Sequence, residues 1–495
     1  MPRELVTIQC GQCGNQVGYR FWDLALREHA AYNAKGVYDE ALSSFFRNVD
    51  TGVQPYRNLP VGDGSGSIRT LKARSVIVDM ECGVINEMLK GPLGDVLDTS
   101  QLISDVSGAG NNWAHGHHVY GPQYHDAILE KIRATVEACE SLQSFLLLHS
   151  IGGGTGSGVG SYILELLADE FPDVFRFTAS VFPSEDDDVI TSPYNAMLSL
   201  AKLVEHADCV LPIENQALIE IVNRTDAKLA AAPGAAVPVA ALGHHDSRAK
   251  PFDGMNGIAA SLLLSLTSSM RFDGSLNVDL NDITMNLVPF PRMHFLLSAM
   301  SPLTSSRDLA RAAAPRTLDQ RMTDIGAGCM ARAAAPRTLD RMFGEVFSRE
   351  HQLIRADPRN HTYLACGLLV RGAATISDIN RNVSRIKPTL KMVHWNNEGF
   401  KLGLCSRPPV GLPYSLLCLA NNTAIAGTFS TMKERFDKLY KRRFYTHHYE
   451  QYMDASNFTD SVEVVEDLIE SYQSMEGATQ PPPVTRLKPR GVSFT

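Results

Sequence analysis

The sequence predicts an α/β protein whose N-terminal domain is a parallel β-sheet with helices on both faces. Residues 1–223 alternate short apolar runs with longer amphipathic ones. The apolar runs, such as "QSFLLLHS", are nearly continuous, which is typical of strands buried on both faces. A second mixed α/β region follows over residues 273–425, and two amphipathic stretches come after it. Strand–helix alternation of this kind predicts a parallel sheet rather than a sandwich or a bundle.

The elements can be placed in order from these runs. The sheet strands are expected at "ELVTIQC", "ARSVIVDM", "QSFLLLHS" and "FRFTASVFP", with helices at "NQVGYRFWDLALREHAAY", "YHDAILEKIRATVEACESL" and "GSYILELLADEF". "MNGIAASLLLSLTSSMRF" is apolar nearly all round, so we expect a buried helix between two domains. "TFSTMKERFDKLYKRR" and "SVEVVEDLIESYQSM" predict two late amphipathic helices.

The composition sets limits on the class of protein. The chain has 495 residues, a net charge of −8 and 44% hydrophobic residues, which is ordinary for a soluble protein and does not indicate a nucleic-acid partner. No apolar run is long enough for a membrane span. Nine widely spaced cysteines favour reduced thiols and a cytosolic or nuclear location. Cys10 and Cys13 form a CxxC pair, but no second pair completes a zinc site, and a redox role stays open beside a loop.

A glycine-rich stretch carries the clearest chemical signal. "HSIGGGTGSGVGS" (149–161) follows an apolar strand and opens a helix. Glycines let backbone N–H groups approach an anion, and the helix N-terminus adds a positive dipole. The stretch lacks the Lys-Ser/Thr ending of a P-loop and the spacing of a dinucleotide fold. We interpret it as a phosphate-binding loop; the alternative is a flexible turn.

Two further loops follow other strands of the same sheet. They are "CGQCGNQ" (10–16) and "SGAGNNWAHGH" (107–117). Loops at the carboxyl ends of parallel strands converge where ligands bind in open α/β sheets. Between them, Asp79 and Glu81 stand at a strand end, and carboxylates beside phosphates are suited to a hydrated Mg²⁺. Alone, the same two acids would be solvated surface residues.

Together these motifs resemble the tubulin family. "GQCGNQ", "SGAGNNWA", "GGGTGSG", "PYNAML" and "NLVPFPRMHF" occur in the family's order and spacing over roughly residues 1–473. "FWDLALREHAAYNAKGVYDEALSSFFRNVD" and "HADCVLPIENQAL" are distinctive of one branch of that family. The resemblance implies a tubulin/FtsZ-like fold: a parallel-sheet GTP-binding domain, a long core helix, a mixed-sheet intermediate domain and a C-terminal helical hairpin.

The same resemblance implies domain boundaries. They are a GTP-binding domain at 1–223, a low-complexity insertion at 224–250, a core helix at 251–272, an intermediate (activation) domain at 273–425, C-terminal helices at 426–473 and a disordered tail at 474–495. This tail lacks the strong acidity of alpha- and beta-tubulin tails, so we do not expect it to recruit basic partners.

The resemblance also assigns roles in GTP/GDP and Mg²⁺ binding. The phosphates would lie on the glycine loop, Gln12 would reach phosphate or metal, Cys13 would lie near the base, and Glu81, with Asp79, would face Mg²⁺ through water. The γ-phosphate would be bordered by a second loop, guanine would be hydrogen-bonded by two asparagines, and Phe252 would stack on the base where the family has Tyr. The residues implied for these loops and the base are Ser150, Gly152, Gly153, Gly154, Thr155, Gly156, Ser157, Gly158, Ala109, Gly110, Asn111, Asn215 and Asn256.

Some positions depart from the family pattern. The loop "VFPSEDDDVITSPYN" is one residue shorter than in beta-tubulin, and Cys82 replaces a Pro. Asp188 matches a ribose-contacting acid, but Ser192 stands where the family usually has Glu. The departures concern the ribose contacts and leave the phosphate contacts intact.

"NVDLNDITMN" (277–286) is implied to act on a neighbouring subunit. In the family this loop enters the nucleotide pocket of the next subunit, where an acid in alpha-tubulin orients water and a Lys in beta-tubulin does not. This chain has Asp282, which we therefore expect to act in trans as the catalytic residue of a GTPase that works only on assembly. The alternative is a solvated loop acid. Histidine clusters, "HGHH" at 115–118 and "HH" at 244–245 and 447–448, lack metal-ligand spacing and are interpreted as surface residues.

"ARAAAPRTLD" occurs twice, at 310–319 and 331–340. Two copies are too few for a solenoid. The second copy leads into "RMFGEVF", which matches a helix start of the family, so residues 310–330 are interpreted as a loop insertion outside the core. Its origin would be a local duplication or a misjudged exon boundary, and the alternative is an adaptation for lateral contacts.

The resemblance implies a structural protein of centrioles and basal bodies, in the cytoplasm and cytoskeleton and at the centrosome. Its partners would be other tubulins, namely delta-tubulin and alpha- or beta-tubulin, together with centriolar proteins. A nucleotide-dependent adaptor that neither polymerises nor hydrolyses GTP stays open, as does a dinucleotide-dependent enzyme, which the glycine spacing disfavours.

Overall fold

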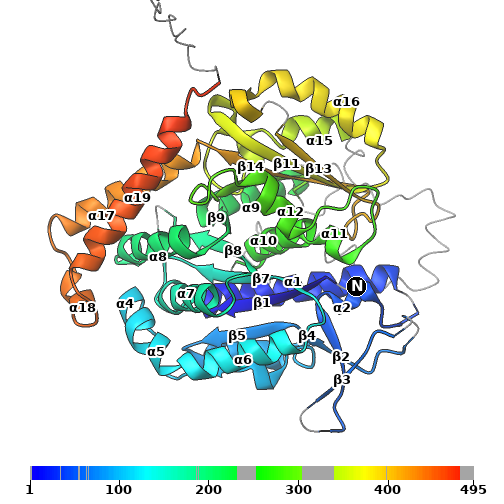
Figure 1. Cartoon of the computed structure of the whole chain (residues 1–495), viewed down its shortest axis with the longest axis horizontal. Helices are drawn as coiled ribbons and strands as arrows, with labels where there is room; N and C mark the ends of the chain where they lie inside the picture. Colours follow the sequence, from blue (N-terminus) through cyan, green and yellow to red (C-terminus); the bar gives the residue numbers. More distant parts are fainter. Residues whose placement is uncertain are drawn as a thin grey trace, which may run out of the picture.

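A computed structural model describes residues 3–33, 35–53, 56–62, 64, 66–184, 187, 189–230, 252–303, 339–396 and 399–479. Within these ranges a parallel six-stranded sheet forms the centre of the N-terminal domain, in the order β6-β5-β1-β7-β8-β9 (Figure 1). Every neighbouring pair in this sheet is parallel, which confirms the predicted fold class. The strands are β1 (Glu4–Cys10), β5 (Ser75–Asp79), β6 (Leu102–Ser104), β7 (Leu142–Ser150), β8 (Phe175–Phe182) and β9 (Cys209–Glu214).

The sheet is buried on both faces, and β7 shows how its sequence achieves this. Phe145 and Leu147 pack into one hydrophobic cluster, while Leu146 and Leu148 pack into the other. Because successive side chains of a strand point to opposite faces, a continuous apolar run supplies both cores at once. The first cluster lies under α6 (His125–Glu137), α7 (Gly160–Glu170) and α8 (Ser192–His206), and the second under α1 (Gly11–Tyr32), α3 (Cys82–Lys90), α9 (Asn215–Ala230) and α10 (Asp253–Leu266).

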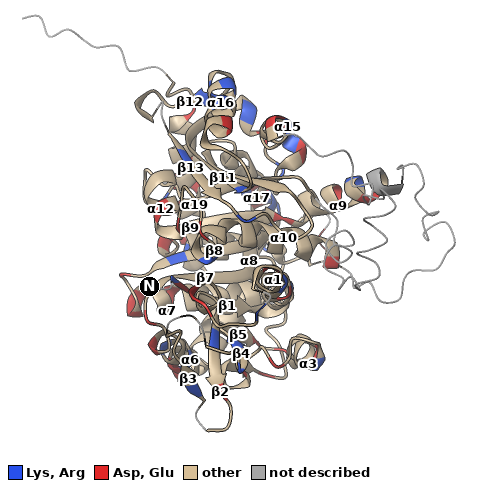
Figure 2. Ribbon diagram, turned by 90° about the vertical axis from the view of Figure 1, so that its right-hand side faces the viewer, with Lys and Arg blue, Asp and Glu red and all other residues tan. Residues whose placement is uncertain are grey.

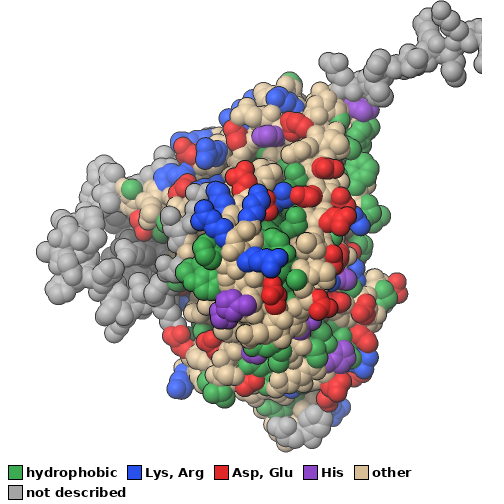
Figure 3. All heavy atoms as spheres, turned by 90° about the vertical axis from the view of Figure 1, so that its left-hand side faces the viewer, with side chains coloured by type: hydrophobic (Ala, Val, Ile, Leu, Met, Phe, Trp, Pro, Cys, Tyr) green, Lys and Arg blue, Asp and Glu red, His purple; other side chains and the backbone are tan. Residues whose placement is uncertain are grey.

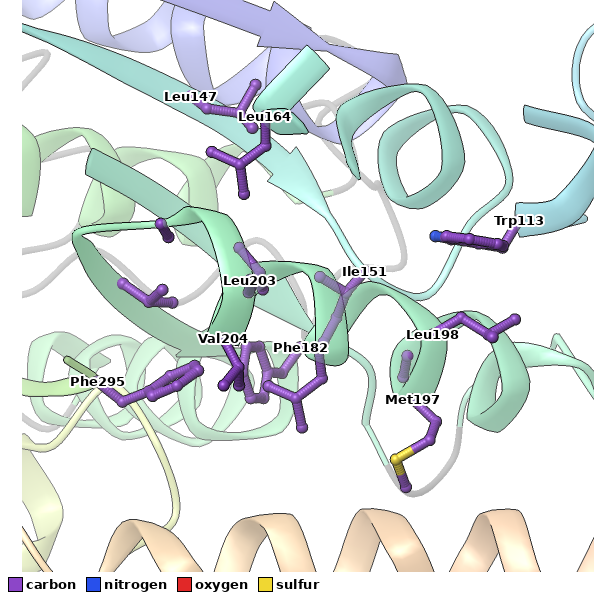
Figure 4. Packing of buried hydrophobic residues seen from close by; sticks show 14 of the residues in the cluster. Trp113, Leu147, Ile151, Leu164, Phe182, Met197, Leu198, Leu203, Val204 and Phe295 are labelled. Atoms are coloured by element: carbon purple, nitrogen blue, oxygen red, sulfur yellow. The ribbon is translucent and has the colours of Figure 1, made fainter. Parts of the chain in front are cut away.

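Figure 4 shows the first of these clusters around α8. Met197, Leu198, Leu203 and Val204 line that helix, and Trp113 and Ile151 approach it from two loops of the sheet edge. Both residues are almost completely buried. The loops that follow β6 and β7 are therefore anchored in the core by an apolar side chain each.

The core helix is shorter than expected. The sequence predicted one buried helix over 251–272, but α10 ends at Leu266 and a separate short helix, α11 (Ser268–Arg271), follows. The Thr267 hydroxyl donates to the Leu263 carbonyl at the break. A hydroxyl that bonds the carbonyl four residues back competes with the backbone and bends helices.

The second domain contains a mixed five-stranded sheet in the order β10-β14-β11-β12, with β13 paired to β11. Arg381 of its outer helix α16 pairs with Asp340 at 3.1 Å, and acidic and basic residues are interspersed over α15 and α16 (Figure 2). Its elements are α12 (Leu280–Leu287), β10 (Leu296–Ser301), α15 (Leu339–Glu345), β11 (Thr362–Gly372), α16 (Ile376–Ile386), β12 (Lys391–Met392), β13 (Phe400–Cys405) and β14 (Tyr414–Asn422).

Two long helices, α17 (Ile425–Tyr440) and α19 (Ser456–Met475), form the expected C-terminal hairpin and pack on α8 (Figure 1). A short helix, α18 (Thr446–Glu450), lies between them. The tail prediction placed disorder from residue 474, which is wrong for its first residues. The Ala478 carbonyl accepts the His394 N–H at 3.0 Å, and the Glu476 carboxylate bonds the Thr423 hydroxyl.

The sequence reading missed a small antiparallel sheet of β2 (Phe46–Asp50), β3 (Arg57–Leu59) and β4 (Thr70–Ala73). Helix α9 continues to Ala230, past the boundary that we expected after residue 223. Most of the predicted low-complexity insertion, the whole insertion at 310–330 and the tail from residue 480 lie outside the described residues. The remaining short helices are α2 (Glu40–Ser43), α4 (Trp113–His115) and α5 (Gly121–Gln123).

Candidate nucleotide site

The three predicted loops meet at the carboxyl edge of the parallel sheet. The first is not a loop: α1 begins at Gly11, directly after β1, so "GQCGNQ" forms the first turns of a helix. Gly11 has a φ of +71°, and a Cβ added there would lie 2.9 Å from the Gly156 nitrogen. Only glycine allows both this conformation and this approach. The N-terminus of α1 therefore packs directly on the glycine loop after β7.

The loop after β6 packs on the same glycine loop from another side. A Cβ added to Gly154 would lie 2.7 Å from the Asn112 nitrogen and 3.0 Å from the Ala109 Cβ. Gly110 and Asn111 both have positive φ and are exposed. The glycine at 154 is thus required by contact between two loops. At Gly153, by contrast, an added Cβ would meet nothing closer than an Asn111 side-chain oxygen at 3.8 Å.

The glycine loop continues into a π-helical turn over Thr155–Val159, and a second π-helical turn, Gly116–Tyr120, follows α4. A Cβ on Gly158 would lie 2.4 Å from the Trp113 carbonyl oxygen of α4 and 2.9 Å from the Gly116 Cα, so α4 and the start of the second turn both touch the first turn. Turns of this type are rare and occur often at functional sites. The first of them leads directly into α7 and contains Thr155 to Gly158, where phosphate contacts are predicted.

The His149 side chain connects the glycine loop to strand β8 by two hydrogen bonds. Its Nδ1 bonds the Gly156 carbonyl at 2.9 Å and its Nε2 bonds the Ser180 hydroxyl at 2.8 Å. Because a carbonyl only accepts, Nδ1 carries the proton and Nε2 accepts from the serine. Burial lowers the pKa of His149 to about 4, so the ring is neutral at pH 7. The sequence reading quoted this residue without assigning it a role.

The two predicted metal-facing acids differ in their surroundings. Asp79 is buried, and its oxygens accept the Glu81 N–H at 3.3 Å and the Asn15 amide at 3.4 Å. Burial raises the pKa of Asp79 to about 6. Glu81 is exposed, and its carboxylate lies against Gly108, where an added Cβ would be 2.5 Å from Oε1. Asp79 therefore orients the turn, while Glu81 presents a carboxylate beside the phosphate loops.

This donor set can be tested against Mg²⁺. No cluster of three metal-ligating side chains occurs among the residues that the structure describes. Mg²⁺ usually binds one or two carboxylates and takes its other ligands from water and substrate phosphates. Glu81, with Asp79 behind it, fits that pattern and does not fit an all-protein site.

Three of the other predicted nucleotide residues, Gln12, Cys13 and Asn215, follow strand ends at the same edge. Gln12 is exposed in the first turn of α1, and burial raises the pKa of Cys13 to about 12, which makes a reactive thiolate unfavourable. Asn215 begins α9 immediately after β9. Asn256 lies in the first turn of α10, and its N–H bonds the Phe252 carbonyl. Asp188 lies outside the described residues.

Phe252 stands in front of α10 with a φ of +71°, and 58% of it is exposed. A bulky residue in the left-handed region is strained, and such strain occurs mainly where function requires it. Ser192, at the position where the family pattern has Glu, donates its hydroxyl to Asp187 at 2.8 Å.

Asp282 lies far from these loops, at the opposite edge of the sheet. It is the third residue of α12, whose N-cap Asp279 accepts a hydrogen bond from Gln143, just inside the amino end of β7. Its carboxylate accepts the Asp279 N–H at 3.4 Å and the Lys401 ammonium at 3.3 Å. About 42% of the side chain is exposed. Asp282 cannot reach the nucleotide loops of its own chain.

Comparison with known proteins agrees with this arrangement. Residues 4–223 match the Tubulin/FtsZ family GTPase domain, and residues 327–434 match the Tubulin C-terminal domain. The chain belongs to the tubulin family, and a GTPase domain implies a site for GTP or GDP. It is 52% identical to the human Tubulin epsilon chain, over 98% of each chain, and 52% identical to the mouse Tubulin epsilon chain, over 97% of this chain and 98% of the relative. It is 33% identical to the Tubulin beta-2 chain of Suillus bovinus over 97% of each.

The branch indicated by the sequence motifs is thus that of the epsilon-tubulins. Within the described ranges, no helix has the length and apolar character needed to span a membrane. Asn195, which lies in "PYNAML", contacts the loop after β6 and the loop after β7. The motif indicates the family, but nothing in its sequence shows which groups this asparagine would bond.

Proposed function

We propose that this chain is a GTP-binding structural tubulin of centrioles and basal bodies. It would assemble head to tail, with GTP at the longitudinal contact, and act in triplet microtubule organisation and the centrosome cycle. The observation that carries the proposal is the convergence of the start of α1 with the loops after β6 and β7, held in contact through Gly11 and Gly154. The identity with epsilon-tubulins supports the cellular role. Partners would be delta-tubulin, alpha- or beta-tubulin, and centriolar proteins.

In this proposal the chain's residues divide the work of nucleotide binding. The glycine loop and the N-terminus of α1 bring backbone N–H groups and a helix dipole to the phosphates. Glu81 would hold Mg²⁺ through water, and a bound Mg²⁺ would neutralise phosphate charge. Phe252 would offer a ring face to guanine, with Asn215 and Asn256 as hydrogen-bond partners. Asp188 would contact the ribose.

Hydrolysis would need a second subunit. Asp282, at the far edge, would enter the next chain's nucleotide site and orient a water by accepting its proton. A contact between unlike surfaces of identical or related chains is heterologous and produces filaments or caps. The two edges of the sheet provide such surfaces.

One observation favours a second function, that of a cap or adaptor that binds GTP but neither polymerises nor hydrolyses it. Asp282 is already held by Asp279 and Lys401 within its own chain. A carboxylate held by a lysine of its own chain is not free to approach a water in the nucleotide site of the next chain. Unless docking breaks this pair, the chain would bind GTP without turning it over.

Two measurements test these functions. Nucleotide released from the purified chain by denaturation should be GTP or GDP in about one equivalent, and dinucleotide or no nucleotide would contradict the proposal. Sedimentation with GTP, alone and with delta-tubulin, should give large assemblies that release phosphate. GTP-bound material that stays small with every tubulin partner would favour the adaptor.

A further inference from the structure

Asn195 joins the nucleotide loops through all of its hydrogen-bonding groups. It lies in the first turns of α8 and is completely buried. Its Nδ2 donates to the Asn111 carbonyl at 2.8 Å and to the Gly152 carbonyl at 2.9 Å. Its Oδ1 accepts the Trp113 N–H at 2.9 Å. Because the carbonyls can only accept and the amide can only donate, the orientation of the side-chain amide is determined.

These bonds fix peptide planes that face the proposed GTP. Asn111 belongs to the loop after β6 and Gly152 to the loop after β7. In a trans peptide the C=O and the following N–H point in opposite directions. Holding the Gly152 carbonyl toward α8 therefore turns the Gly153 N–H away from α8. One side chain thus sets the relative position of the two loops that would bind the β- and γ-phosphates.

The fourth bond of Asn195 comes from the C-terminal region. The Tyr449 hydroxyl of α18 donates to Asn195 Oδ1 at 2.6 Å, across 254 positions of sequence. Tyr449 is buried, and burial raises its pKa, so the hydroxyl keeps its proton and acts as the donor. Asn195 Oδ1 consequently has both of its acceptor positions occupied.

Residues 441–450, called here the C-terminal turn, touch the nucleotide loops at a second point and α8 at a third. The Asn112 amide donates to the His448 carbonyl at 2.9 Å, and the Tyr194 hydroxyl donates to the Phe444 carbonyl at 2.7 Å. The outer side of the turn is exposed, with Lys441, Arg442, Arg443, Phe444 and Tyr445. Figure 3 views the face with the C-terminal helices and shows Lys and Arg side chains gathered there beside hydrophobic ones.

We propose that Asn195 is the positioning residue of the two phosphate loops and that Tyr449 couples it to the C-terminal turn. GTP affinity then depends on how that turn is seated against α8 and the loops. The inference rests on the proposed GTP site and adds what positions its loops.

The test compares two tyrosine hydroxyls that join α8 and the C-terminal turn, Tyr449 on the turn and Tyr194 on α8. Tyr449→Phe removes the bond to Asn195 and the longer contact with the Thr191 carbonyl at 3.5 Å, while the matched control Tyr194→Phe removes the bond to Phe444 and leaves Asn195 untouched. Both side chains are buried, and each loses one hydroxyl. Titration with GTP should show affinity roughly three- to tenfold weaker for Tyr449→Phe, the effect of one hydrogen bond, and less than twofold weaker for Tyr194→Phe. Equal effects of the two variants, or none for Tyr449→Phe, would overturn the proposal.

A double-mutant cycle shows whether Tyr449 acts through Asn195. In the Asn195→Ala background, Tyr449→Phe should weaken GTP binding no further, because the bond that it removes is already absent. Additive losses would mean that Tyr449 acts by another route and would contradict the coupling. The comparison of the two tyrosine variants decides the proposal even if Asn195→Ala does not fold.

A measurement without nucleotide separates this proposal from the GTP site itself. Amide hydrogen exchange at Trp113, whose N–H bonds Asn195, should be faster in nucleotide-free Tyr449→Phe than in the parent and in Tyr194→Phe. Unchanged exchange contradicts the linkage whatever the ligand. If the parent chain binds no GTP, the proposed function fails while the exchange result still decides whether Tyr449 holds Asn195.

Discussion

The two edges of the parallel sheet differ in whether one chain supplies all the groups that the proposed function needs there. At the carboxyl edge, three segments from distant parts of the chain touch through Gly11, Gly154 and Gly158, and the site is assembled within one chain. At the amino edge, Asp282 projects from α12 and is held by Lys401. In the proposed function, the carboxyl edge binds a nucleotide by itself, whereas Asp282 acts only on the nucleotide of the next chain.

This difference separates binding from turnover. Binding requires preorganised backbone groups, and buried contacts between loops supply them. Turnover, in the proposed function, requires a carboxylate near the attacking water, and Asp282 of a neighbouring chain would bring it. Variants at the carboxyl edge should therefore change the GTP affinity or the stability of the isolated chain. Variants at the amino edge should change only the GTP hydrolysis that assembly stimulates.

The largest expected effect is on assembly-stimulated phosphate release. Asp282→Ala should lower it by about 100-fold or more, the usual contribution of a positioned acid or base, and should leave the GTP affinity of the isolated chain unchanged. Asp282→Glu keeps the carboxylate and serves as the control. Release at the parent rate in Asp282→Ala would make α12 a contact surface without a chemical role.

His149 should make the carboxyl edge sensitive to acid. Its folded pKa of about 4 lies below the ordinary value of 6.5, so the unfolded chain binds the extra proton first as the pH falls. Stability should therefore fall from pH 6.5 to pH 4, by about 3 kcal/mol from this residue. Urea unfolding at pH 7 and pH 4 measures the loss of unfolding free energy between these pH values. In His149→Gln that loss should be about 3 kcal/mol smaller than in the parent. An identical loss in parent and variant would show that His149 is not the group responsible.

Gly154→Val should weaken GTP binding by more than tenfold, or more than about 1.4 kcal/mol. The physical reason is the contact with Asn112, because a side chain at 154 pushes the two loops apart. Gly344→Ala in α15, where an added Cβ meets nothing within 4 Å, is the control. If folded Gly154→Val and the parent bind GTP with equal affinity in a titration, this loop is not part of the GTP site.

The smallest effect is expected from deleting residues 310–330. Loop closure entropy grows only with the logarithm of length, so the thermal midpoint should fall by no more than about one or two degrees. Calorimetry of the deletion variant measures this. A loss several times larger would mean that the first copy of the repeat belongs to the folded core.

The fold was predictable where a local pattern determines it. Continuous apolar runs gave the strands of the parallel sheet, because burial on both faces requires them. The small sheet of β2, β3 and β4 was not found, since its strands are short and β3 is largely exposed. The break at Thr267 was also missed, because one hydroxyl in an apolar run does not change the helical period.

The site was predictable where glycine supplies the signal. The glycine loop and the loop after β6 could be recognised because close backbone contact excludes other residues. The first segment was wrongly read as a loop, since nothing local shows that α1 begins at Gly11. Asn195 and Tyr449 could not be paired, because their contact depends on how α18 packs against α8 and leaves no pattern along the chain.

The central claim, that binding is complete in one chain and turnover is not, is tested most directly by single-turnover GTP hydrolysis in the isolated monomer. The account predicts about one bound GTP per chain and negligible phosphate release until a second tubulin chain is added at assembling concentrations. Phosphate release by the monomer at a rate independent of protein concentration and unchanged by Asp282→Ala would contradict it.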